Sequence, residues 1–343
     1  FSVAAFSRHA ADDYGAKPVL LMPTCKKGSW QSSAQQSQKL MQAWKLSPFG
    51  EAKHGPLKEV ASDGDGRRRA ALYLVLMHKH LYEFLSNLPG LNLYTGEDGI
   101  TMCFDPKHLF KRICTLLCSL KGILVNGVII NKTLVAQWLE KIPGHDCIHA
   151  LLQPKDSQDV GCCALLRSCA IWIHLTYPRS RETPTVLSEK CLLDPFINPT
   201  ISLSEEMIQL VKFAHMACAL FIKHDGDFSH QLFGDIQCMI KSFISKIAHS
   251  KVLNPSLKVF LCLLGDDIPE ILFGRSRMKG GHSPNHAVDE LHQRFLSALR
   301  MDKIFRKYPY LERRARHLRL IRNRDVDHLS PRNWGWRPYH RVV

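Results

Sequence analysis

The chain has 343 residues, of which 45% are hydrophobic, and its formal net charge is +15 at pH 7. This hydrophobic fraction is enough for a sizeable core, which excludes global disorder. No uninterrupted apolar run approaches the roughly 20 residues of a membrane-spanning helix, so we expect no membrane partner. The positive charge favours a polyanion such as nucleic acid, since attraction and counterion release both promote its binding. The alternative is a basic protein whose charge serves only solubility.

The 12 cysteines show no CxxC pair, and several, such as Cys218 and Cys262, lie inside apolar runs. A cysteine in that setting behaves as a small hydrophobe. Together with the lack of a signal peptide, this usage predicts a reducing, intracellular compartment. The chain starts at Phe1 rather than at a methionine, so we expect a fragment of a longer protein.

The first third of the chain has a pattern of short strands and helices. Residues 17–22 are typical of a strand, and residues 30–46 of an amphipathic helix. A further strand and a tight acidic turn follow. The turn contains Asp63 and Asp65, and one of them is expected to cap a helix that begins near Arg67.

The same arrangement recurs around Asp105. A short apolar strand ends at Phe104, and Pro106 occupies the first helical position, which proline favours. Further along the chain we predict helices within 130–180, at 203–224, at 230–250, at the segment "DDIPEILFGRSR" and at 286–305, with a proline-containing connector over 178–199. Because helices dominate and the few strands each precede a helix, we predict an α/β, mainly helical fold class with a small sheet.

Three acidic residues share one context, because Asp63, Asp105 and Glu270 each follow a short apolar segment near a helix start. Carboxylates at the ends of neighbouring strands can converge on Mg²⁺ or Mn²⁺, which prefer oxygen ligands. Two such ions can activate water and stabilise a leaving oxygen in phosphodiester chemistry. The alternative is helix capping, which spacing alone favours.

Three segments carry a family resemblance by their order: "VASDGDGRRRAAL", "FDPKHLFKRICTLL" and "FLCLLGDDIPEILFGRSRMKGGHSPN". Together they resemble transposase-derived proteins of the P element and THAP-domain type, including a large group of uncharacterised fungal relatives. The resemblance covers roughly residues 55–335. Its most specific parts are "DPKHLFK" and "EILFGRSRMKGG".

The resemblance implies a partial RNase H-like core, with a small mixed sheet, interrupted by a large helical insertion. The first strand of that core, with the first acidic residue, is expected to precede Phe1. The implied segments are the N-terminal part of the core (1–120), the helical insertion (121–255), C-terminal core helices (256–305) and a basic tail (306–343).

The resemblance also assigns site residues. Asp63 matches the second acidic residue of the family and Glu270 the last, and both are expected to be ligands of Mg²⁺ or Mn²⁺. Asp105 is a further candidate catalytic carboxylate. His108 and Asp267 are expected to support the site.

Basic residues near these acids are candidate DNA-binding residues, because arginine matches phosphate oxygens well. They are Arg67, Arg68, Arg69, Arg275, Arg277, Lys279 and, in the basic tail, Arg313, Arg314 and Arg316. The alternatives are solvated helix faces and a disordered basic tail.

The function implied is that of a transposon-derived, nuclear, DNA-binding protein related to metal-dependent transposases, which cleave DNA and transfer strands. Three departures from the family pattern predict a catalytically incomplete chain. The first acidic residue is missing, Asp65 and three arginines stand where the family commonly has Asn, and Pro269 replaces a leucine. A non-catalytic nucleic-acid-binding protein and a helical protein-interaction protein remain alternatives. The P element group binds a guanine nucleotide, but no GxxxxGK[ST] loop occurs here, so nucleotide binding stays open. A homo-oligomer is compatible with this interpretation.

Overall fold

The structure is a computed structural model of the chain. It describes residues 2–3, 17–20, 28–80, 91–125, 128–140, 191–196, 198, 201–223, 229–253, 259, 261, 267–279, 287–308 and 311. The predictions for Arg313, Arg314 and Arg316 lie outside the described residues, as does most of the predicted basic tail. The side chain of Asp267 lies outside them as well.

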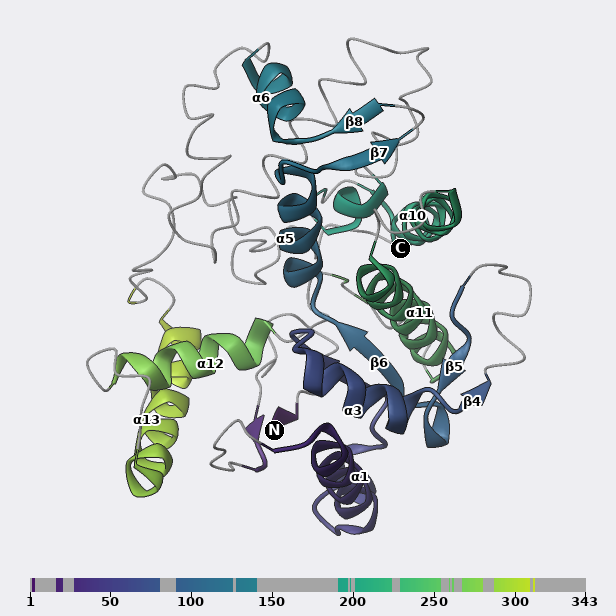
Figure 1. The fold of residues 1–343 in the computed structure, drawn as a ribbon. Coiled ribbons are helices and arrows are strands. Elements are labelled where there is room, and N and C mark those ends of the chain that lie inside the picture. Colours follow the sequence, from purple (N-terminus) through teal and green to yellow (C-terminus); the bar gives the residue numbers. More distant parts are fainter. Residues whose placement is uncertain are drawn as a thin grey trace.

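Helices make up most of the described chain (Figure 1). They are α1 (Trp30–Leu46), α2 (Glu51–His54), α3 (Gly66–Leu76), α5 (Pro106–Leu117), α6 (Lys132–Glu140), α10 (Leu203–Lys223), α11 (His230–Leu253), α12 (Asp267–Met278) and α13 (Val288–Lys307). The helix predicted over 30–46 is confirmed residue for residue. Residues 191–196 are helical although they fall within the predicted connector, so the prediction is wrong there. Leu192 and Phe196 are buried in the core, and this apolar content outweighs the nearby prolines. None of the described helices is long and apolar enough to cross a membrane.

The described strands are short and pair two by two. They are β1 (Ser2–Val3), β2 (Lys17–Pro18), β3 (Glu59–Ser62), β4 (Lys79–His80), β5 (Tyr94–Thr95), β6 (Thr101–Phe104), β7 (Ile123–Val125) and β8 (Val128–Ile130). The β3–β6 pair is parallel, whereas β1–β2, β4–β5 and β7–β8 are antiparallel. A mainly helical chain with little sheet is therefore confirmed. The β7–β8 hairpin was not predicted, although Asn-Gly, a strong hairpin signal, stands between its strands in the sequence.

The parallel pair brings two predicted strand–turn–helix units side by side. Ser62 pairs with Phe104 in the register, so both strands end at the same edge. The backbone N–H of Asp105 extends the ladder by donating to the Ser62 carbonyl over 3.2 Å. Helix α3 follows β3 after a short turn, and α5 follows β6 directly. The residues just after β3 and just after β6, Asp63 and Asp105, therefore lie at one edge.

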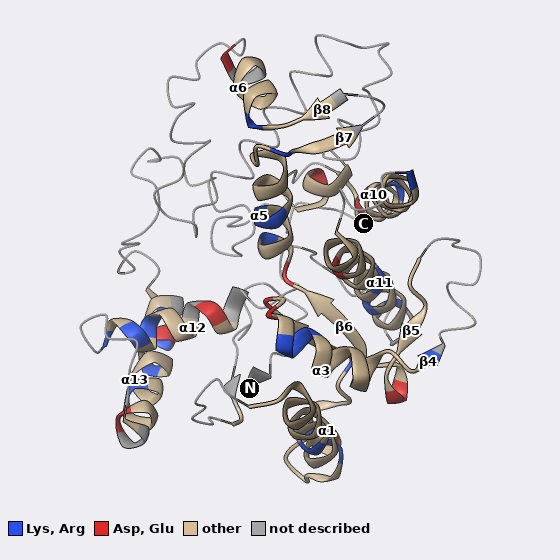
Figure 2. Ribbon diagram, in the orientation of Figure 1, with Lys and Arg blue, Asp and Glu red and all other residues tan. Residues whose placement is uncertain are grey.

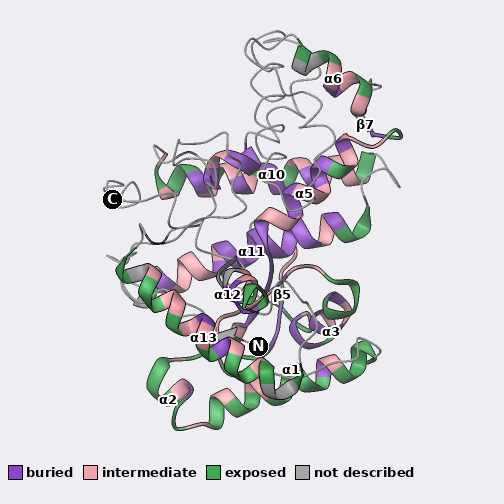
Figure 3. Ribbon diagram, turned by 90° about the vertical axis from the view of Figure 1, so that its left-hand side faces the viewer, coloured by how far each residue is buried: buried purple, intermediate pink, exposed green. Residues whose placement is uncertain are grey.

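Helix α11 is the centre of the main core. Figure 3 shows it buried along most of its length, and Ile236, Ile240 and Phe243 have no exposed surface. Phe196 joins this helix to α5, because its ring lies 5.8 Å from that of Phe243 and 5.4 Å from that of Phe110. The core thus contains residues from both the predicted segment 1–120 and the predicted insertion 121–255.

Helices α12 and α13 pack on each other around a second, small core. It consists of the buried Leu272, Phe295 and Ala298, and the ring of Phe273 lies edge-on to that of Phe295 at 5.5 Å. Figure 1 shows α12 beginning near the end of β6 and the start of α5. This placement carries Glu270, in the first turns of α12, toward the edge formed by β3 and β6.

Candidate acidic site and nucleic-acid interface

Asp63 lies in the turn between β3 and α3 and does not cap the helix. Its Oδ1 accepts hydrogen bonds from the Asp65 N–H (3.2 Å) and the Ser62 hydroxyl (3.4 Å). The cap is Asp65, whose carboxylate accepts from the N–H groups of Arg67 (3.1 Å) and Arg68 (3.2 Å). Of the two acids proposed as the cap, the structure selects Asp65. The Asp63 side chain is 36% exposed and pairs with the Arg68 guanidinium over 3.2 Å.

Asp105 is the cap of α5. Its side chain accepts from the backbone N–H of His108 over 3.1 Å, and the residue is only 2% exposed. A buried carboxylate at this position satisfies an N–H group of the first turn and opposes the helix dipole. Asp105 therefore has the helix-capping geometry that was the alternative to a metal ligand.

His108 connects the two acid-bearing segments. Its imidazole Nε2 lies 2.9 Å from Oε1 of Glu270, a residue 162 positions away in the sequence. The same residue donates its backbone N–H to Asp105, so one histidine contacts a carboxylate on each side. The structure therefore brings His108 and Glu270 together and places Asp105 directly beside them.

The surroundings of His108 and Glu270 favour the protonated imidazole and the ionised carboxylate. The hydrogen bond to the Glu270 carboxylate and the nearby charge of Asp105 raise the pKa of His108, outweighing the effect of its burial. Partial burial alone would raise the pKa of the Glu270 carboxyl. However, the hydrogen bond and charge of His108, with the charges of Lys107 and Lys111, lower that pKa below its ordinary value.

A Glu270→Gln variant should therefore lose stability in a pH-dependent way. The raised pKa of His108 contributes stability that is present below its ordinary value of 6.5 and is lost as pH rises through the folded value. The lowered pKa of Glu270 contributes stability that is present above 4.5 and is lost as pH falls through the folded value. Thermal melts should thus show the largest gap between wild type and variant from pH 4.5 to 6.5 and a smaller one at alkaline pH. A gap that does not change with pH would contradict the charged pair.

The predicted DNA-binding residues fall into two groups by exposure. Arg67, Arg68, Arg277 and Lys279 are exposed. Figure 2 shows lysine and arginine on α3, α5 and α12, next to acidic residues at the strand ends. This arrangement presents positive charge to solvent around the acidic edge.

Arg69 and Arg275 were predicted to contact DNA, and the structure corrects that assignment. Both are buried, with exposures of 9% and 3%. Arg275 pairs with Asp302 of α13 and lies over the ring of Phe305, with Cζ 5.2 Å from the ring centroid. Arg69 pairs with Asp235 of α11. These guanidinium groups hold helices together, and phosphate could not reach them without disrupting the fold.

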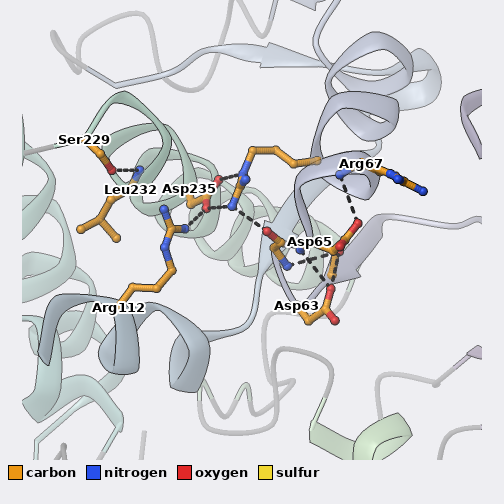
Figure 4. A network of polar contacts seen from close by, with 10 residues as sticks. Asp63, Asp65, Arg67, Arg112, Ser229, Leu232 and Asp235 are labelled. Atoms are coloured by element: carbon orange, nitrogen blue, oxygen red, sulfur yellow. Dashed lines mark hydrogen bonds and ion pairs between the residues drawn. The ribbon is translucent and has the colours of Figure 1, made fainter. Parts of the chain in front are cut away.

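Asp235 of α11, which was not among the predicted site residues, is fully buried and lies at the centre of this contact (Figure 4). The Arg69 guanidinium donates to both of its carboxylate oxygens, over 2.8 and 2.7 Å, and Arg112 of α5 donates to the same carboxylate. The sequence of α11 mixes polar and apolar residues along its whole length, so its pattern did not mark Asp235 as buried. In the structure its charge has partners, as a buried charge requires, because an unpaired one is very costly.

The donor chemistry suits a hard cation, although each of the three acids already has a partner within the protein. Asp63 and Glu270 offer the carboxylate oxygens that Mg²⁺ and Mn²⁺ prefer. Asp63 is engaged by Arg68, Glu270 by His108 and Asp105 by the start of α5. Within the part of the chain that the structure describes, no group of three or more His, Cys, Asp or Glu side chains could hold a metal ion.

Comparisons with known proteins bear on the fold. No family model and no curated protein matches the chain. Among solved structures, the Drosophila P element transposase strand transfer complex matches with a TM-score of 0.56 and 14% sequence identity. The chain resembles a transposase in fold. The match covers 82% of this chain and 65% of the transposase chain, so the chain spans just under two thirds of that protein's length. The resemblance to THAP-type and fungal proteins and the RNase H-like core rest on the sequence motifs, and remain predictions.

Proposed function

We propose that this chain is a transposase-related protein that binds DNA at the edge where β3 and β6 end. The observation that carries the proposal is the parallel β3–β6 pair, which sets Asp63 and Asp105 at one edge of a fold similar to a DNA transposase. The net charge of +15 supports a polyanionic partner. The matched structure is a transposase strand transfer complex, and this likeness suggests DNA as the partner of this chain too.

Cations from three helices support this location. Arg67 and Arg68 are exposed in the first turn of α3. Lys107 and Lys111 stand one turn apart on α5, close enough for their charges to act on Glu270. In addition, Arg277 of α12 and Lys279, just after that helix, are exposed. Contacts of this type hold phosphates and set the register of DNA on a protein, without reading its sequence.

The double variant Arg67→Ala/Arg68→Ala should bind duplex DNA more weakly than wild type. Each lost phosphate contact reduces the slope of log affinity against log salt by about 1, so we expect a reduction of about 2. The matched control Lys212→Ala/Lys223→Ala removes the same charge from exposed residues of α10 and should leave the slope nearly unchanged. Fluorescence anisotropy with a labelled duplex measures both. If the slope falls equally in the two double variants, DNA binds at another surface or binding depends on net charge alone.

Metal-dependent cleavage of DNA is a second candidate function, which the exposure of two carboxylates favours. The side chains of Asp63 and Glu270 are 36% and 40% exposed, so both are accessible. If the site is active with Mn²⁺, Asp63→Asn and Glu270→Gln should each reduce cleavage by about 10³-fold or more, as removal of essential groups does. The control Glu97→Gln alters an exposed carboxylate that pairs with Lys79 and should retain activity. If wild type does not cleave DNA, the non-catalytic alternative is correct, in line with the engagement of both carboxylates by cationic partners.

A further inference from the structure

The fully buried Asp235 gathers cations from two helices that lie far from it in the sequence. Its carboxylate accepts two hydrogen bonds from Arg69 of α3 and one from Arg112 of α5. Arg69 and Asp235 are 166 residues apart. Figure 4 shows the Arg112 guanidinium pointing at the Asp235 carboxylate. Asp235 therefore joins α11 to the helices that follow β3 and β6.

The Arg69 guanidinium extends this contact to the turn that holds Asp63. Its Nη2 donates to Oδ2 of Asp235 and also to the carbonyl of Gly64, each over 2.7 Å. Gly64 has a φ of +81°, a conformation that favours glycine. A Cβ on Gly64 would lie 3.2 Å from that same Nη2, so glycine also allows the close approach of the guanidinium. The backbone next to Asp63 is thus held by Arg69.

Both strand ends are tied to the same carboxylate. The Cζ atom of Arg69 lies 5.5 Å from the centroid of the Phe104 ring, and Phe104 is the last residue of β6. Arg112 belongs to α5, whose cap is Asp105. The edge that carries Asp63 and Asp105 is therefore linked to Asp235 of α11 by two residues, Arg69 of α3 and Arg112 of α5.

A purely structural ion pair would be a weak explanation for this arrangement. Burying charges is expensive, and well-packed apolar residues in their place are often as stable or more stable. Apolar residues could not donate a hydrogen bond to the Gly64 carbonyl. The several N–H donors of an arginine guanidinium can reach that oxygen and the Asp235 carboxylate at the same time. The geometry of the turn is therefore what this ion pair provides.

We propose that Asp235 is a positioning residue that fixes the Asp63 turn through Arg69. This inference rests on the proposed function in so far as the turn belongs to the proposed DNA-binding edge. The physical link itself, from Asp235 through Arg69 to Gly64, can be measured without DNA or metal.

Hydrogen exchange on the full chain tests the link with Asp235→Asn and Arg69→Lys. Both variants should exchange the amides of residues 62–69 at least about tenfold faster than wild type, because a hydrogen-bonded charged anchor is lost. Arg69→Lys keeps the positive charge but lacks the several donors of the guanidinium. If charge alone held the turn, this variant would protect the amides of residues 62–69 as wild type does. It also provides a test of the link if Asp235→Asn fails to fold.

Asp302→Asn is the matched control, because it breaks another buried Arg–Asp pair away from the turn. It should speed exchange in α12 and α13 and leave residues 62–69 unchanged. The inference is overturned if both test variants protect the turn as wild type does, or if Asp302→Asn affects it equally. Wild-type DNA binding, measured in the same preparation, decides the proposed function separately: its absence refutes that function, while the exchange result still decides the role of Asp235.

Discussion

Asp235→Ala is expected to lower the free energy of unfolding by about 3–5 kcal/mol, the usual cost of removing one partner from a buried ion pair. The side chain of Asp235 has no exposed surface, and that of Arg69 is only 10% exposed. Without the carboxylate, the Arg69 guanidinium stays buried and keeps its hydrogen bond to the Gly64 carbonyl. Arg112 loses the same partner but is 31% exposed and can turn toward water. Urea unfolding followed by circular dichroism measures the change.

An exposed ion pair gives the comparison for Asp235→Ala. Asp98 pairs with Lys45 over 2.6 Å, and both side chains are more than half exposed. Water and salt screen such a pair, so Asp98→Ala should unfold at nearly the wild-type urea concentration. If the two alanine variants shift the midpoint by similar amounts, the Asp235 cluster does not hold the fold together as described.

Phe110→Ala should destabilise the protein by about 3–5 kcal/mol, as buried phenylalanine truncations do. The ring has no exposed surface and meets Phe196 edge-on at 5.4 Å. Its removal leaves a cavity between α5 and the core around α11, which the close-packed neighbours can fill only in part. Thermal or urea unfolding measures the loss.

The control for Phe110→Ala is Phe49→Ala, because Phe49 is 74% exposed. Its truncation leaves no cavity and should change stability by less than about 0.5 kcal/mol. A small loss for Phe110→Ala would mean that α5 is not packed against this core, and the position of Asp105 and His108 would then need revision.

Local signals in the sequence predicted those elements that depend on local chemistry. The apolar spacing of 30–46 and the Asp105-Pro106 helix start are properties of neighbouring residues, and the structure has both as expected. The choice between Asp63 and Asp65 as the cap depends on turn geometry, and stayed open until the structure selected Asp65.

Long-range contacts explain what the sequence could not predict. Arg67, Arg68 and Arg69 are equivalent in the sequence, yet only Arg69 faces α11 and becomes buried. Whether a residue is buried depends on its packing against distant segments. Asp235, which accepts hydrogen bonds from Arg69, is 166 positions away in the sequence. The contact between His108 and Glu270 spans 162 positions and was anticipated only because the family resemblance placed both near one site.

The affinity of the wild-type chain for duplex DNA at increasing salt tests the central claim most directly. A chain that binds with cations from α3, α5 and α12 releases counterions from the DNA. With about 6–10 phosphate contacts, its affinity should fall by about 10³–10⁵ between 50 and 200 mM salt. An affinity that hardly changes over this range, or no binding at low salt, would contradict the account and favour a helical protein-interaction protein.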